Sequence, residues 1–231
     1  MVSRTQHTVV PDVMAADPDD DAASLGERIR QTGADAQQVL AEVLARHGAR
    51  LRKMVQLRMD PRLQGRIDPS DVLQEAYLEA SARFAEYLKA PAMPVFAWLR
   101  FITSQELMVL HRRHLGAQAR DAGREISLER RISPEASSAI LADQLVGRLT
   151  TPTQAARRTE RKALLERSLN QMDPLDREVL LLRHFEELTN HETAHLLGIS
   201  PTAANNRYVR ALRRLKEILD SMPGGGQELG P

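Results

Sequence analysis

The sequence predicts an all-α protein made of two small helical domains joined by a flexible linker. Apolar residues recur at intervals of three and four along much of the chain, and no stretch alternates apolar and polar residues long enough to indicate a strand. Of the 231 residues, 42% are hydrophobic but only 3% are aromatic, so the core must consist mainly of aliphatic side chains. This composition favours helical bundles over β-sandwiches, whose strands are rich in aromatic and β-branched residues.

The first domain is expected to span residues 36–115, after an N-terminal extension, residues 1–35, that we expect to be disordered. A first helix is expected to stop at Asp60-Pro61, and a second to begin at Pro69, capped by Asp68 or Ser70. The segment Ala90–Pro94 breaks the chain before a third helix. The helices are thus predicted at about 36–59, from 69 up to that break, and at about 95–114.

The second domain is expected to span residues 159–221. Residues 116–158 are weakly patterned, so they are interpreted as a linker that contains a possible short helix at Ile140–Leu149. Within the domain, Gly198 separates the last two of four expected helices. The glycine-rich tail, residues 222–231, is expected to be disordered. The helices before Gly198 are predicted at 162–172, at 177–185 and around His191–His195.

Cysteine content and hydropathy indicate the compartment. The chain has no cysteine, which excludes disulfides and thiolate metal sites and fits a reducing interior. No apolar run approaches the roughly 20 residues of a membrane span, and the N-terminus lacks the apolar centre of a signal peptide. We therefore expect a cytoplasmic protein without a membrane span. The net charge is only +1, so the location of each sign matters more than the total.

The segment His191–His195 matches the H-E-x-x-H signature of zinc peptidases. Two histidines four residues apart lie on one helix face and can chelate zinc, and the glutamate between them can polarise a bound water. The position where the longer signature has a third histidine is occupied by Pro201, and no histidine follows His195. A zinc metallopeptidase therefore stays an alternative that the missing ligand argues against.

The same segment predicts a helix-turn-helix. Gly198 suits a turn with positive φ, and Ser200 followed by Pro201 suits the start of a second helix. No acidic residue occurs in residues 193–216, and a local field of one sign indicates a polyanionic partner. A basic surface helix without a nucleic-acid role is the structural alternative. The predicted apolar stripe of the second helix is Ala204, Tyr208, Ala211, Leu215 and Ile218, and its basic residues are Arg207, Arg210, Arg213, Arg214 and Lys216.

At these residues the chain resembles a known family. The segment Glu192–Ser200, ETAHLLGIS, followed by a basic helix resembles region 4 of sigma factors, and Met172–Arg183 resembles the approach to that motif. In the first domain, Asp68–Leu78 and Phe96–Leu99 resemble motifs of sigma region 2. Because both motif sets occur in order and leave no room for a middle domain, the chain is similar to extracytoplasmic-function (ECF) sigma factors.

The resemblance implies a sigma factor, a subunit that brings core RNA polymerase to promoter DNA, with no catalysis, cofactor or metal of its own. It implies polymerase binding by region 2, at Asp71, Gln74 and Glu75. It implies contact with the −10 element and its unpaired strand by Arg100, Phe101, Arg112 and Arg113. It implies that Thr202, Asn205 and Asn206 read bases of the −35 element while Arg207, Arg210 and Arg213 hold phosphates.

Three further expectations follow from the resemblance. An anti-sigma protein is a possible additional partner. Gln105 and Val109 stand where family members often carry Asn and Asp, so promoter-strand contacts at these two positions are not carried over. Trp98 is expected to pack in the core rather than to stack on a base. A helix-turn-helix regulator that binds DNA without polymerase is the main alternative function.

Overall fold

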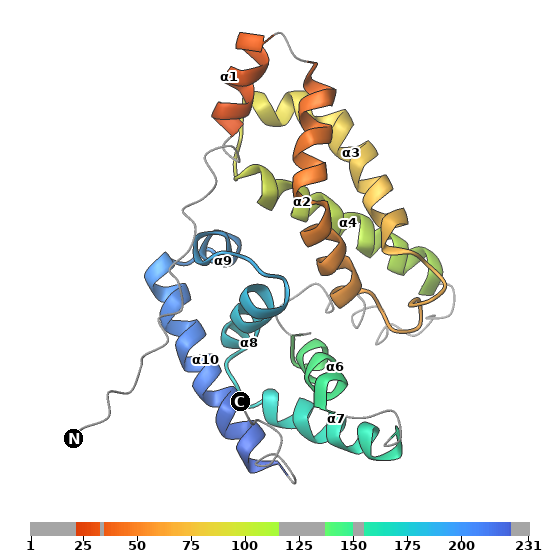
Figure 1. Ribbon diagram of the computed structural model, residues 1–231, viewed down its shortest axis with the longest axis vertical. Coiled ribbons are helices and arrows are strands. Elements are labelled where there is room, and N and C mark those ends of the chain that lie inside the picture. The colour runs from red at the N-terminus through yellow and green to blue at the C-terminus, as the bar shows by residue number, and fades with distance from the viewer. Residues whose placement is uncertain (1–21, 33–34, 116–136, 150–154, 223–231) are drawn as a thin grey trace, which may run out of the picture.

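The computed structural model describes residues 22–32, 35–115, 137–149 and 155–222, and in these ranges the chain forms helices and turns without a strand. The predicted all-α class is confirmed. Figure 1 shows α1–α4 grouped in one half of the molecule and α6–α10 in the other, here called the N-terminal and C-terminal modules. The elements are α1 (Ala22–Thr32), α2 (Ala36–Arg58), α3 (Pro69–Lys89), α4 (Val95–Leu115), α6 (Ser137–Leu149), α7 (Ala155–Leu169), α8 (Pro174–Leu180), the π-helix η5 (Leu181–Phe185), α9 (Asn190–Leu197) and α10 (Pro201–Ser221).

Local signals set the helix boundaries in the N-terminal module. At the start of α3 the side chain of Asp68 accepts a hydrogen bond from the Ser70 amide at 2.7 Å. The Asp71 carboxylate reaches back to the Asp68 amide at 3.3 Å and completes a capping box. Helices α2, α3 and α4 begin and end within one or two residues of their predicted positions.

The structure corrects the expectation that residues 1–35 are disordered, because α1 occupies residues 22–32. The side chain of Leu25 is only 2% exposed and lies in the core of the N-terminal module, with Ile29 packed against the same core. A pair of apolar residues four positions apart is too short a pattern to predict a helix. Helix α1 is instead stabilised by its packing on α2 and α3. Residues 1–21 lie outside the described ranges.

The region expected to be a linker is also partly helical. Helix α6 is longer than the short helix considered at Ile140–Leu149, and its Ile140, Leu141 and Val146 are buried in the core of the C-terminal module. Helix α7 begins before the predicted position 162. The rest of the expected linker, residues 116–136 and 150–154, lies outside the described ranges, as do residues 223–231 of the predicted tail.

The two modules share apolar contacts. Leu182 and Leu188 of the C-terminal module are buried in the core that contains Phe84 and Leu99. Leu57 of α2 packs in turn against the core of the C-terminal module. The modules are therefore packed together rather than held apart.

Candidate nucleic-acid interface

Helices α9 and α10 form the predicted helix-turn-helix. Gly198 ends α9 in the left-handed conformation, with φ 63°. The Ser200 hydroxyl accepts a hydrogen bond from the Ala203 amide at 3.1 Å and caps α10, while Pro201 is its first residue. After the turn, α10 packs against both α8 and α9. The predictions for Gly198, Ser200 and Pro201 are confirmed.

One face of α10 is buried and the opposite face is exposed, as the sequence predicts. Ala204, Ala211, Leu215 and Ile218 are buried, and Tyr208 is half-buried with the Arg183 guanidinium 4.5 Å from its ring centroid. The opposite face is open to solvent. It carries four predicted DNA-contacting residues, Thr202, Asn205, Asn206 and Arg213, together with Val209.

Arg207 and Arg210, two predicted phosphate anchors, are already paired. Arg207 Nη1 lies 2.7 Å from Asp176 Oδ1, and Arg210 Nε lies 2.7 Å from Asp176 Oδ2. Asp176, on α8, is only 5% exposed. Its hydrogen bond and its charge raise the pKa of Arg210. The segment 193–216 is free of acids in sequence, but the fold brings an acid to it from α8.

The H-E-x-x-H motif has a structural role in α9. The Glu192 carboxylate accepts a hydrogen bond from the Thr189 amide at 2.7 Å and ion-pairs with Arg50 Nη2 at 2.7 Å. It is therefore engaged in a capping box and a contact with α2. His191 and His195 are exposed. Among the described residues, no group of three side chains could hold a metal ion.

Helix α4 carries the residues predicted to contact the −10 element. Phe101 is 48% exposed, and Arg112 and Arg113 are exposed near the end of the helix. Arg100 is half-buried, and its Nε and Nη2 donate to Glu186 Oε2 at 3.0 and 2.9 Å. Three of the four side chains are thus exposed to solvent, whereas Arg100 is bound to the carboxylate of Glu186, the residue that follows η5. Trp98 packs against Tyr87, with ring centroids 4.4 Å apart, as expected.

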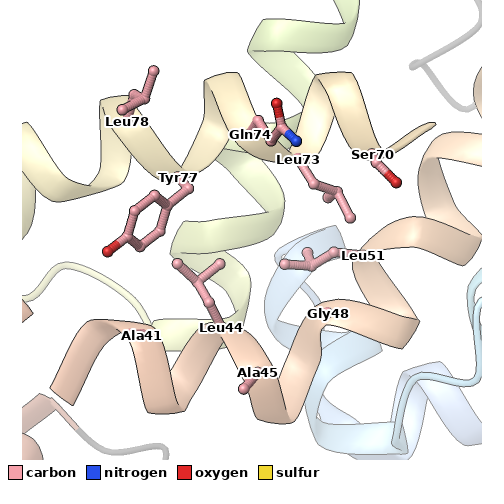
Figure 2. Close-up of a pocket in the computed structure, with 10 residues that line it drawn as sticks. All are labelled: Ala41, Leu44, Ala45, Gly48, Leu51, Ser70, Leu73, Gln74, Tyr77 and Leu78. Atoms are coloured by element: carbon pink, nitrogen blue, oxygen red, sulfur yellow. The ribbon is translucent and has the colours of Figure 1, made fainter. Parts of the chain in front are cut away.

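The predicted polymerase contacts, Asp71, Gln74 and Glu75, are all exposed on α3. Gln74 borders an apolar groove of about 640 Å³ between α2 and α3. Figure 2 shows Leu73 and Tyr77 pointing from α3 toward α2, whereas Leu78, which is 63% exposed, points away. Acidic, amide and apolar side chains therefore lie together on one surface of α3. Its groove is lined on the α2 side by Ala41, Leu44, Ala45, Gly48 and Leu51.

Sequence reasoning missed a buried ion cluster between the modules. The Arg58 guanidinium, fully buried on α2, donates to Glu178 Oε1 at 2.6 Å and to Glu186 Oε1 at 2.7 Å. Burial alone would lower the pKa of Arg58, but the charges of Glu178 and Glu186 outweigh it and raise that pKa. The sequence did contain a signal that Arg58 is buried, because Arg58 stands four residues after Met54 and continues the apolar stripe of α2.

Residues 162–215 match the family model described as sigma-70, region 4. The C-terminal module therefore carries a sigma-70 region 4 domain. Within region 4, residues 162–215 include the end of α7, all of α8 and α9, and most of α10 with its exposed stripe. The predicted resemblance to sigma factors is confirmed.

The chain is also similar to proteins that are named as sigma factors. A 60-residue segment, 26% of this chain, is 42% identical to RNA polymerase sigma-E factor of Streptomyces avermitilis and spans 34% of that protein. The Streptomyces antibioticus protein of the same name is 38% identical over 60 residues, and spans 26% of this chain and 33% of that protein. The match therefore covers about a third of the length of these relatives.

The chain is also similar to a solved structure, that of CnrH in complex with the cytosolic domain of CnrY. The TM-score is 0.46 and the sequence identity 23%, with 88% of this chain and 100% of that chain covered. Within the described residues, no helix has the length and hydropathy needed to cross a membrane.

Proposed function

We propose that this chain is an ECF-type sigma factor that binds core RNA polymerase in the cytoplasm and directs it to promoters, without catalysis of its own. The observation that carries the proposal is the exposed stripe of α10, which displays Thr202, Asn205 and Asn206 beside Arg213 in a region 4 domain. Amide side chains near the start of a helix can pair with adenine edges in the major groove, while arginines neutralise phosphates.

The three sets of predicted residues divide the work between the modules. Helix α10 reads the −35 element, and Phe101, Arg112 and Arg113 on α4 meet the −10 element. An exposed aromatic ring with nearby cations suits unpaired DNA, because bases stack on the ring and phosphates pair with the cations. The exposed residues Asp71, Gln74 and Glu75 on α3 bind polymerase beside the apolar groove.

Transcription in vitro with core polymerase and a randomised promoter pool tests the proposal. We expect the chain to select templates that share two sequence elements at fixed spacing. The Asn205→Ala variant should lose base preference at one position of the upstream element, at a cost of about 1–3 kcal/mol. Glu217→Gln, an exposed change on the same helix, is the matched control. Transcription that does not depend on the chain would refute the proposal.

Charge reversal on α3 tests the polymerase contact. We expect Glu75→Arg to weaken binding to core polymerase while DNA binding by region 4 stays unchanged. Asp71→Arg should also weaken it, but Asp71 belongs to the capping box of α3, so its variant combines two effects. Glu86→Arg, an exposed residue farther along α3, is the control. Equal polymerase affinity of the Glu75 and Glu86 variants would remove this assignment.

Two alternatives give different results. A helix-turn-helix regulator would bind duplex DNA but would not co-purify with core polymerase. A zinc peptidase would contain stoichiometric zinc that is lost in His195→Ala, but Glu192 is engaged by Thr189 and Arg50. Binding of an anti-sigma protein stays a prediction.

A further inference from the structure

Two large apolar side chains of α10 remain exposed, Val209 at 39% and Leu212 at 37%. Among the described residues of the C-terminal module, they are the large hydrophobic side chains that face solvent. At 100° per residue, Val209 lies on the same face of the helix as Thr202 and Arg213. Leu212 lies closer to the buried Leu215, at the edge of the core. Val209 thus stands among the polar residues of the exposed stripe, and Leu212 stands beside it.

The stability of α10 does not explain a valine at position 209. Valine has a lower helix propensity than alanine, because its branched side chain crowds the preceding turn. Its exposed methyl groups also gain nothing from water. Alanine or a charged residue would therefore suit this position better in the isolated chain. A binding partner that covers the Val209 side chain would offset both disadvantages.

The neighbours of Val209 indicate which chemical group covers it. Asn205 and Asn206 lie one helical turn before it and Arg213 one turn after it, and all three are exposed. Their side chains suit base edges and phosphates in the major groove. The apolar group that a base presents in that groove is the C5-methyl of thymine. Because valine has one strongly preferred rotamer in a helix, Val209 can meet such a methyl with little loss of side-chain entropy.

We propose that Val209 reads a thymine of the −35 element through an apolar contact with the C5-methyl group of that base. This inference rests on the proposed function, in which α10 enters the major groove of that element. Along the helix axis, Val209 lies about 4.5 Å from Asn206 and about 6 Å from Asn205. With about 3.4 Å between successive base pairs, the thymine lies within about two base pairs of the position that Asn205 reads.

Deoxyuridine substitution tests the contact, because uracil lacks only the C5-methyl group of thymine. The full chain first selects duplexes from a randomised pool by binding alone, without polymerase. Each thymine of the selected duplex, on both strands, is then replaced by deoxyuridine in turn. The dissociation constant is measured for the natural chain, Val209→Ala and Leu212→Ala. Leu212→Ala is the matched control, since it shortens an almost equally exposed apolar side chain of the same helix outside the proposed contact.

We expect one deoxyuridine position to weaken binding of the natural chain and of Leu212→Ala about fourfold, the effect of losing one buried methyl group. In Val209→Ala the same replacement should change the affinity by less than about twofold, because the apolar partner of that methyl is gone. The slope of log K against log salt should be the same in Val209→Ala and the natural chain, since no phosphate contact is lost. A full deoxyuridine effect in Val209→Ala, or no sensitive thymine, would overturn the proposal.

A change in the DNA alone separates the methyl group from the hydrogen bonds of the base. At the sensitive position, the T·A pair is replaced by C·G and by 5-methylcytosine·G, two pairs that differ only in the methyl group. The natural chain should bind the methylated duplex about two- to fourfold more tightly. Val209→Ala should bind both duplexes equally. Equal affinity of the natural chain for the two duplexes would contradict the methyl contact, however the variants fold.

These outcomes are distinct from the test of the proposed function. If transcription with core polymerase succeeds but no thymine depends on Val209, only this inference fails and the proposed function stands. If the duplex pool yields no preferred sequence, Val209 reads no base and the inference also fails. Transcription with core polymerase then still decides the proposed function by itself.

Discussion

The Arg58 guanidinium donates to Glu186 Oε1 at 2.7 Å, and neither side chain has any exposed surface. Glu186 also accepts from Arg100, so a single carboxylate of the C-terminal module joins α2 and α4 of the other. Because a charge buried without its partner is costly, this contact makes the packing of the two modules sensitive to single substitutions.

Removing the Glu186 carboxylate should destabilise the chain strongly. In Glu186→Leu, Arg58 loses one of its two carboxylate partners, and Arg100 loses the carboxylate that it contacts. We expect the free energy of unfolding, measured in urea, to fall by about 3–5 kcal/mol. The control Glu217→Gln changes an exposed pair on α10 and should leave it unchanged within error. If Glu186→Leu and the control lose the same free energy of unfolding, the buried ion cluster contributes nothing to stability.

Stability should fall in acid through Glu186. Burial raises the pKa of Glu186, but the charges of Arg100 and Arg58 outweigh it, so its pKa lies below the ordinary value of 4.5. The unfolded chain therefore binds this proton more readily, and the stabilisation is complete above 4.5 and lost as pH falls through the folded-state pKa. Urea unfolding between about pH 6 and pH 3 should show a smaller pH slope in Glu186→Gln, which cannot titrate. Identical slopes would exclude this role.

Asp176 should compete with DNA phosphates for Arg207 and Arg210. We expect Asp176→Asn to release the Arg210 guanidinium, whereas Arg207 keeps its contact with Asp173 at 3.3 Å. The salt dependence of duplex binding should therefore steepen by about 1 in log K against log salt. The same variant should lose about 1–2 kcal/mol of stability, less than a fully buried pair, because Arg210 is 61% exposed. Asp143→Asn, which breaks the half-exposed ion pair between Asp143 of α6 and Lys162 of α7, is the control for both measurements. An unchanged salt slope would show that Asp176 does not withhold these cations.

Replacing two glycines with alanine should change the stability of the chain in opposite directions. Gly198 has φ 63°, and a Cβ there would contact nothing within 4 Å, so Gly198→Ala tests backbone conformation alone. A left-handed alanine costs about 1–2 kcal/mol, so thermal unfolding should move to lower temperature. Gly48 lies within α2 and also has open space, so Gly48→Ala should stabilise the chain by about 0.5–1 kcal/mol. A destabilised Gly48→Ala would show that the groove lined by this residue tolerates no added methyl group.

Local sequence signals predicted much of the structure. Asp68 and Ser200 cap helices where the sequence places them, and Gly198 adopts the predicted turn. The exposed stripe of α10 follows from the 3.6-residue period, since burial of Ala204 and Ala211 fixes the opposite face. Helix α1 could not be predicted in the same way, because two apolar residues give too little pattern until α2 and α3 cover them.

The sequence by itself determined the all-α class, the helix-turn-helix and the side chains that α10 presents, because caps, turns and periodicity act over a few neighbouring residues. Only the tertiary structure decided which charges are engaged. Asp176 reaches Arg210 from 34 residues away, and Glu186 reaches Arg58 from 128 residues away. Ion pairs depend on distance in space rather than along the chain, so a segment that is purely basic in sequence can be half-neutralised once it folds.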